Sequence, residues 1–174
     1  MSDGAAAAVM GAVPEAEPAK KKLSMVVMSG DMDKLFGAFI IATGAAAMGM
    51  EVTMFFTFWG LRALKKNERT GKTLFGRMLG AMYGGDITKS DPSKFSFGGM
   101  GRWMFKKMMG SHNVSSLLEL RNLAEQLGVK MYPCQMSMDV MEIPQEVMIP
   151  GAQQACGVGF FLGEASESQI NLFI

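Results

Sequence analysis

Cysteine and histidine are scarce in this chain of 174 residues, which holds two of the first and one of the second. Two cysteines are too few for a disulfide framework or a four-cysteine zinc site. A single histidine excludes zinc sites built on two or three histidines, and it leaves His112 as the one candidate base for a catalytic triad. His112 precedes a predicted helix in a loop, where surface histidines are common. We therefore expect no metal site.

Nucleotide-binding motifs are also absent. No G-x-G-x-x-G follows the first predicted strand, and the chain has no G-x-x-x-x-G-K-[ST] phosphate-binding loop. It has no C-x-x-C either, so a thioredoxin-type mechanism lacks its local resolving thiol. We expect no cofactor, although a flavin or nucleotide in the crevice of an open α/β sheet stays an alternative.

Long apolar segments are missing as well. The longest uncharged stretch, residues 35–50, falls short of the roughly 18–20 apolar residues that a membrane-spanning helix needs. The Ala-rich start, Ala5 to Val13, has no basic residues before it and runs into Pro14 and Glu15, which argues against a signal peptide. The expected location is the cytoplasm, with peripheral attachment to a membrane left open.

The chain does have enough apolar residues for a core. Hydrophobic residues make up 49% and charged residues 19% of it, which indicates a folded domain. Residues 1–22 mix Ala, Pro, Glu and Lys without any period, and they predict a disordered tail. Residues 23–174 are then expected to form a single domain, with an insert at about residues 62–112.

The insert differs from the rest of the chain in charge. Residues 62–112 carry eleven Lys or Arg against three acids, a net charge of +8, whereas the remaining residues carry −7. Two methionine-rich pieces, residues 74–83 and 100–109, have the period of amphipathic helices. Such a basic and apolar surface suits an acidic protein or an anionic lipid surface, and we expect no nucleic acid partner. The alternative is a solvated loop whose lysines keep the methionines soluble.

The first half of the domain predicts a strand, a helix and a second strand. Residues 23–28 form a short apolar run closed by Ser29-Gly30, which indicates a buried strand and a turn. Residues 35–48 have the small residues of a helix that lies close to a sheet. Residues 51–58 are β-branched and aromatic, which is typical of a buried strand. Two strands joined through a helix imply a parallel pair.

The second half repeats this alternation. A helix over residues 114–127 precedes a strand over residues 129–132, at whose carboxyl end Pro133 and Cys134 stand. The elements expected after Cys134 are all short: helices over residues 135–140 and around 144–148, a strand over residues 158–162, a helical turn over residues 164–168 and a strand over residues 172–174. The alternation favours an α/β fold, with an open, mainly parallel sheet and helices on both of its faces.

Cys134 is the residue with the strongest chemical signal. It stands at the carboxyl end of a strand, which is where open α/β sheets bind their ligands. A thiol at the start of a helix meets exposed N–H groups, which favour the thiolate. A buried structural cysteine is the alternative. Cys156 precedes the strand expected over residues 158–162, and we interpret it as packing, although the fold could bring it near Cys134.

Three segments carry a resemblance to a known family: PCQMSMDVM at residues 133–141, FFTFWGL at residues 55–61 and SQINLFI at residues 168–174. Over residues 23–174 the chain resembles the DsrE/DsrF-like sulfurtransferase family. Within it, the chain is similar to the long, insert-bearing DsrE3-like branch, which is often labelled peroxiredoxin family protein. The peroxidatic Thr-x-x-Cys pattern is absent, because Met131 stands three residues before Cys134.

The resemblance has consequences for fold, assembly and chemistry. It implies a flavodoxin-like sheet, a homo-oligomer that is a trimer or a multiple of one, and a cysteine that carries sulfur as a persulfide. That cysteine maps onto Cys134. The partners that it implies are TusA-like sulfur carrier proteins and rhodaneses. It assigns no role to Cys156 or to the insert.

We therefore interpret the chain as a sulfurtransferase or sulfur carrier, in which catalytic Cys134 takes up sulfane sulfur and passes it to a partner thiol. The turns at Ser29-Gly30 and Trp59-Gly60 follow neighbouring strands, and their backbone N–H groups are candidates to bind the anionic sulfur group of the substrate. The alternatives are a non-enzymatic interaction scaffold that works through the insert, and the flavin or nucleotide binder. The sulfur donor, the acceptor and the direction of transfer are not set by the sequence.

Overall fold

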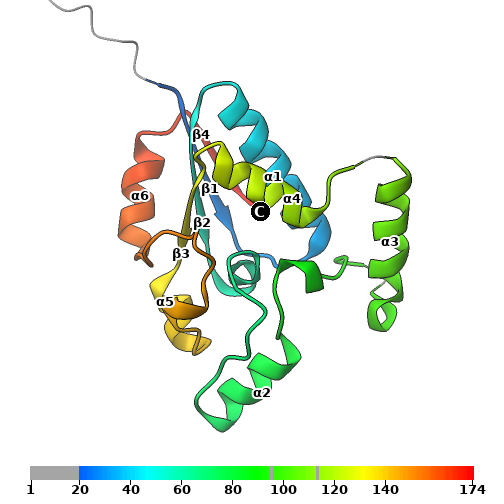
Figure 1. Cartoon of the computed structure of the whole chain (residues 1–174). Coiled ribbons are helices and arrows are strands. Elements are labelled where there is room, and N and C mark those ends of the chain that lie inside the picture. Colours follow the sequence, from blue (N-terminus) through cyan, green and yellow to red (C-terminus); the bar gives the residue numbers. More distant parts are fainter. Residues whose placement is uncertain (1–19, 95, 113) are drawn as a thin grey trace, which may run out of the picture.

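A computed structural model describes residues 20–94, 96–112 and 114–174 of the chain. Of the tail expected over residues 1–22, residues 1–19 lie outside the described residues. Four strands form one sheet: β1 (Lys22–Val27), β2 (Glu51–Phe56), β3 (Lys130–Pro133) and β4 (Ile170–Phe173). Their order is β3-β2-β1-β4, and each neighbouring pair is parallel. The predicted open, parallel sheet is therefore confirmed (Figure 1).

Two helices cover one face of this sheet, α1 (Met32–Ala47) and α4 (Leu117–Gln126) (Figure 1). Alternate strand residues such as Met25 and Met54 point to this face, where they are fully buried with Phe39 of α1. The alanines on the buried side of α1 let that helix lie close to the strands. The larger cluster of the core lies between this face of the sheet and the two helices.

The opposite face is covered by α6 (Val158–Ser166), against which the other alternating set of strand residues packs, Phe55 and Tyr132 among them (Figure 1). The strand predicted over residues 158–162 is wrong, because these residues open α6. A short apolar run does not distinguish a strand from a helix, and a sheet with apolar residues on both faces needs a helix on its second face. The helical turn predicted over residues 164–168 falls at the end of α6.

The predicted insert contains two helices that stand away from the sheet, α2 (Leu74–Met82) and α3 (Met100–Ser111), with the 3-10 helices η2 (Ile87–Lys89) and η3 (Phe97–Gly99) between them (Figure 1). Both α2 and α3 leave large apolar side chains in solvent. These exposed residues are Leu74, Phe75, Met78, Met82, Met100, Trp103, Met104 and Met108. Among the described residues, no helix combines the length and the apolar character needed to cross a bilayer.

Short helices follow two of the strands. The 3-10 helix η1 (Phe58–Ala63) comes directly after β2, so the strand expected over residues 51–58 ends two residues early. Phe58 has a φ of 44°, which breaks the extended backbone there. After β3 come α5 (Gln135–Val140) and the 3-10 helix η4 (Gln145–Val147), both where the sequence predicts a short helix.

Candidate functional site

Backbone hydrogen bonds bring the carboxyl ends of the strands together at one edge of the sheet. Thr57 N–H donates to Val27 O at 3.0 Å, which joins the ends of β2 and β1. Cys134 N–H donates to Phe56 O at 2.8 Å, which joins the end of β3 to that of β2. Cys134 therefore stands at the carboxyl edge of the sheet, after its outermost strand β3, and ligands of open α/β sheets bind beyond the carboxyl ends of the strands.

Cys134 is buried on the side of the sheet that α6 covers. Its exposed fraction is 4%, and it packs in a cluster with Phe55 and Phe161, whose rings stack with centroids 5.3 Å apart. Cys134 is also the N-cap residue of α5, where its carbonyl accepts Met138 N–H at 3.0 Å. A reagent in solution reaches Cys134 only when the covering side chains move.

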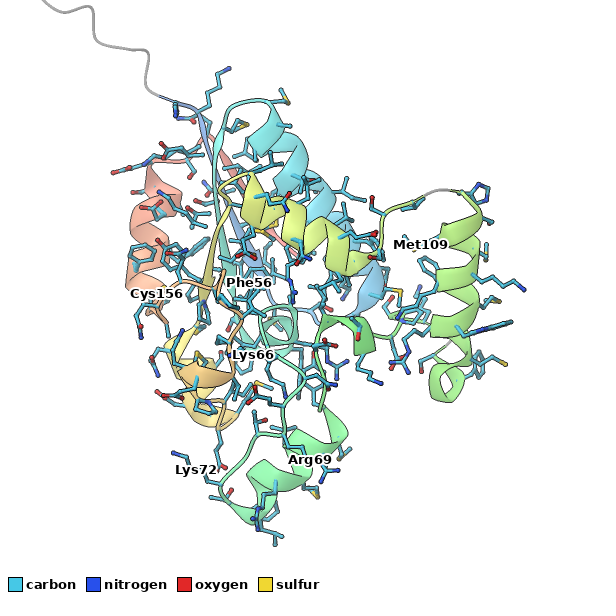
Figure 2. The ribbon with its side chains drawn as sticks, viewed as in Figure 1. Phe56, Lys66, Arg69, Lys72, Met109 and Cys156 are labelled. Carbon is cyan, nitrogen blue, oxygen red and sulfur yellow. The ribbon has the colours of Figure 1, made fainter. Side chains whose placement is uncertain are left out.

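Cys156 lies beside Cys134 through paired backbones. Its N–H donates to Pro133 O at 3.0 Å, and its carbonyl accepts Gln135 N–H at 3.0 Å. Figure 2 labels Cys156 in the segment that leads into α6. Both cysteines are free thiols. Burial, with a contribution from Cys134, raises the pKa of Cys156 to about 11, so this thiol stays protonated near pH 7 and is a poor nucleophile.

A buried hydroxyl pair between the end of β2 and the start of α5 was not predicted from the sequence. Thr57 Oγ1 and Ser137 Oγ lie 2.7 Å apart, and both residues are buried. Thr57 follows β2, and Ser137 stands one turn into α5. Their hydrogen bond therefore fastens the helix that begins after Cys134 to the end of the neighbouring strand. The one signal in the sequence is the position of Ser137, three residues after Cys134.

The two turns predicted to bind substrate, Ser29-Gly30 and Trp59-Gly60, lie against each other. Gly60 N–H donates to Met28 O at 2.8 Å, so this donor is already used within the chain. Ser29-Gly30 follows β1, which is two strands from β3, and neighbouring strands are about 4.8 Å apart. The first turn is therefore about 10 Å from Cys134 along the edge, and a role for either turn in binding stays a prediction.

Tyr83, which follows α2, holds these turns together. Its hydroxyl donates to Trp59 O at 2.5 Å, and its ring meets the Trp59 ring edge-on with centroids 4.8 Å apart. A Cβ on Gly30 would overlap with the Tyr83 hydroxyl, so only glycine permits this approach. Burial raises the pKa of Tyr83 to about 12, which keeps the hydroxyl a donor. The sequence placed Tyr83 only in an apolar stripe of the insert.

Ligands for a metal ion do not gather in the described part of the chain, where no group of three or more His, Cys, Asp or Glu is placed to hold one. His112 is exposed at the end of α3. What the edge of the sheet does offer is a thiol at the start of a helix, with a second and protonated thiol beside it.

Comparison with known proteins gives the family. Residues 19–173 match the DsrE/DsrF/DrsH-like family. The chain is 41% identical over 156 residues to the uncharacterized protein YrkE of Bacillus subtilis, covering 88% of this chain and 97% of YrkE. It is 38% identical over 159 residues to the sulfur carrier protein DsrE2 of Allochromatium vinosum, covering 89% of this chain and 99% of DsrE2.

The fold is also similar to a solved structure. The crystal structure of the ychN protein from E. coli matches with a TM-score of 0.55 at 10% identity, covering 88% of this chain and 99% of ychN. At that identity the likeness concerns the fold alone. The family match and the two relatives cover nearly the whole described chain. The chain therefore belongs to the DsrE/DsrF/DrsH-like family.

Proposed function

We propose that this chain is a sulfurtransferase that carries sulfane sulfur as a persulfide on Cys134. The observation that carries the proposal is the position of Cys134, after β3 and at the start of α5, in a family with a member named as a sulfur carrier. That edge of the sheet is where such folds bind ligands. Residues 133–141 and 55–61 further support the long, insert-bearing DsrE3-like branch, as part of the same proposal.

The proposed reaction needs one cysteine and consumes no oxidant or reductant. The Cys134 thiolate attacks the outer sulfur of a donor persulfide, the S–S bond of the donor breaks, and the donor leaves as a thiolate. Cys134 then holds the transferred sulfur as Cys–S–SH. An acceptor thiolate attacks this outer sulfur, the S–S bond at Cys134 breaks, and Cys134 returns as a thiolate. Each step replaces one S–S bond by another.

The surroundings support Cys134 rather than Cys156 as the carrier. The nucleophile in sulfur exchange is the thiolate, and burial raises the pKa of Cys156 to about 11. Cys156 instead joins the segment before α6 to the end of β3 through two backbone hydrogen bonds. Its substitution by serine keeps the backbone and removes a thiol, which makes Cys156→Ser the matched control for Cys134→Ser.

Transfer requires that the cover over Cys134 opens. Phe161 is the one buried residue of α6. Its neighbours Val158, Phe160 and Leu162 are 61%, 43% and 59% exposed. A helix held by so little buried surface opens locally at a lower cost than the core does. We therefore place the approach of donor and acceptor at α6, and the apolar side chains exposed on it are suited to contact a partner protein.

The partners that fit this chemistry are proteins with an accessible thiol or persulfide, such as TusA-like sulfur carrier proteins and rhodaneses. Persulfide exchange needs reduced thiols, for which the cytoplasm is the expected compartment. The proposal also includes a homo-oligomer, a trimer or a multiple of it. Light scattering should then give a mass well above the 18.8 kDa of one chain, and a stable monomer would count against this part.

A second candidate function rests on the insert. The exposed fractions of Phe75 and Trp103 are 75% and 64%, and both stand among exposed basic residues. Aromatic and basic side chains on amphipathic helices are typical of proteins that bind at a lipid surface. We propose that α2 and α3 attach the chain to an anionic lipid surface, and capture of an acidic protein instead would overturn this assignment.

The proposed transfer is tested by intact mass. Wild-type protein incubated with polysulfide should gain mass in steps of one sulfur atom, and a reductant should remove the gain. An acceptor thiol added after removal of excess polysulfide should take the sulfur up. Cys156→Ser should behave like the wild type, and Cys134→Ser should gain nothing. Equal loading of Cys134→Ser would exclude Cys134 as the carrier.

A further inference from the structure

Two cations lie buried side by side where η1 ends. Arg62, in η1, is 8% exposed, and Lys65, three residues on, is 3% exposed. Among the described residues, no carboxylate lies within ion-pair distance of either side chain. Arg62 donates one long hydrogen bond, from Nη1 to Lys89 O at 3.3 Å, and its buried Nε has no partner. No described group accepts a hydrogen bond from Lys65 Nζ, and this atom, unlike Arg62 Nε, keeps some contact with solvent.

Such an arrangement is unfavourable without a counterion. A buried charge is tolerated where an opposite charge and hydrogen bonds replace the lost water, and a second cation nearby adds repulsion. Burial lowers the pKa of Lys65, and the charge of Arg62 lowers it further. The carboxylate of Glu68, which is exposed, raises this pKa. The Tyr83 ring, 3.7 Å from the Arg62 guanidinium carbon, stabilises Arg62. Within the described ranges, no aromatic ring lies against the Lys65 ammonium in this way.

A small cavity adjoins both cations. Its lining includes Arg62, Lys65, Thr70, Gly80 and Tyr83, and its volume of about 10 Å³ is close to that of one water-sized group. The last turn of α2 forms one wall. A Cβ on Gly80 would overlap with the Thr70 carbonyl, so glycine is what allows α2 to approach this closely.

We propose that Arg62 and Lys65 form a buried binding site for a small inorganic anion, with α2 closing over it. The anion accepts hydrogen bonds from Arg62 Nε and Lys65 Nζ and offsets part or all of their positive charge. The cavity as it stands is close in size to one water molecule, so a monatomic anion such as chloride requires it to widen slightly. A tetrahedral oxyanion such as sulfate or thiosulfate requires α2 to shift outward. The site is separate from Cys134 and does not depend on sulfur transfer there.

The experiment compares anions at constant ionic strength. Thermal unfolding is measured in potassium gluconate that is replaced stepwise by chloride, sulfate or thiosulfate. The wild type should show a saturable rise in Tm for the anion that fits, about 5–10 °C at a hundredfold excess over Kd. A saturable rise with chloride alone assigns a halide site, and one with an oxyanion assigns an oxyanion site with a movable α2. No saturable rise with any of the three would overturn the proposal.

The variants separate binding from a general salt effect. Lys65→Met keeps the volume of the side chain and should abolish the saturable rise. Lys66→Met is the matched control, because Lys66 bonds the Glu146 carbonyl outside the cavity and should keep the wild-type response. Figure 2 labels Lys66. An equal rise in Lys65→Met and in the wild type would refute the assignment.

A second readout does not depend on the folding of Lys65→Met. The chain has two tryptophans, and in a Trp103→Phe background the emission reports Trp59, which contacts the Tyr83 ring over Arg62. Titration with the preferred anion should change this emission and saturate at the same concentration as the Tm. Emission that does not respond to any anion would overturn the site.

Discussion

Replacing Phe161 by alanine should open the route to Cys134. Phe161 is the buried residue of α6, its ring stacks on Phe55 with centroids 5.3 Å apart, and it lies in the cluster that holds Cys134. Burial of a phenylalanine side chain contributes about 2–3 kcal/mol. Because each 1.4 kcal/mol is a factor of ten in population, its loss should raise the open fraction of α6 by about 30–150-fold.

The assay is the rate at which a small thiol reagent labels Cys134. It is run in a Cys156→Ser background, so that Cys134 is the one thiol in the chain. When the helix closes faster than the reagent reacts, the labelling rate is proportional to the open fraction. Phe161→Ala should therefore label about 30–150 times faster than its parent.

Two controls decide whether opening is local. Leu162→Ala changes a side chain of α6 that is 59% exposed and should alter the labelling rate less than about threefold. Leu120→Ala, in the core on the other face of the sheet, should lower the Tm without accelerating labelling. An unchanged labelling rate in Phe161→Ala, with an intact circular dichroism spectrum, would refute the view that α6 covers Cys134.

Three further predictions concern the hydroxyl pair, Cys156 and the insert. Thr57→Val leaves the Ser137 hydroxyl without a partner and should cost about 1–3 kcal/mol in urea unfolding; Ser137→Ala added to it should recover part of this loss, and two additive losses would refute the bond. Between pH 9 and 11 the Cys156 thiol ionises in the unfolded chain but not in the folded one, because its pKa is raised from 9.0 to about 11; stability should therefore fall as pH rises through this window, and a Cys156→Ser profile identical to the wild type would contradict it. Binding to anionic vesicles should weaken as salt is raised, and also when glutamine replaces the exposed basic residues of the insert; salt-independent binding would contradict an electrostatic contact. These exposed residues are Arg69, Lys72, Arg77, Lys89, Lys94, Lys106 and Lys107.

Much of the fold follows from local patterns. The apolar run at residues 23–28 and the β-branched run at residues 51–58 are recognisable as strands because both faces of a covered parallel sheet are apolar. Residues 158–162 have the same apolar character and form a helix instead. These residues form a helix because α1 and α4 leave the second face of the sheet uncovered. That is a property of the whole sheet and not of five residues.

The candidate site also has features that local sequence predicts and features that it does not. Cys134 is predictable because the end of a strand and the start of a helix are both local features. The contact of Cys134 with Cys156, the Thr57–Ser137 bond and the packing of α2 over Arg62 and Lys65 join segments that are distant in sequence. No local period encodes them, so they become visible only once the strand order is known.

Peptide mapping shows which of the two cysteines holds the transferred sulfur. Wild-type protein is loaded with polysulfide, alkylated to trap persulfides and cleaved after glutamate. Residues 131–174 contain no Lys or Arg, but Glu142 and Glu146 stand between the two cysteines, so this cleavage separates Cys134 from Cys156. We expect an alkylated persulfide in the Cys134 peptide and an alkylated plain thiol in the Cys156 peptide. Extra sulfur on Cys156 alone, or on neither peptide, would contradict it.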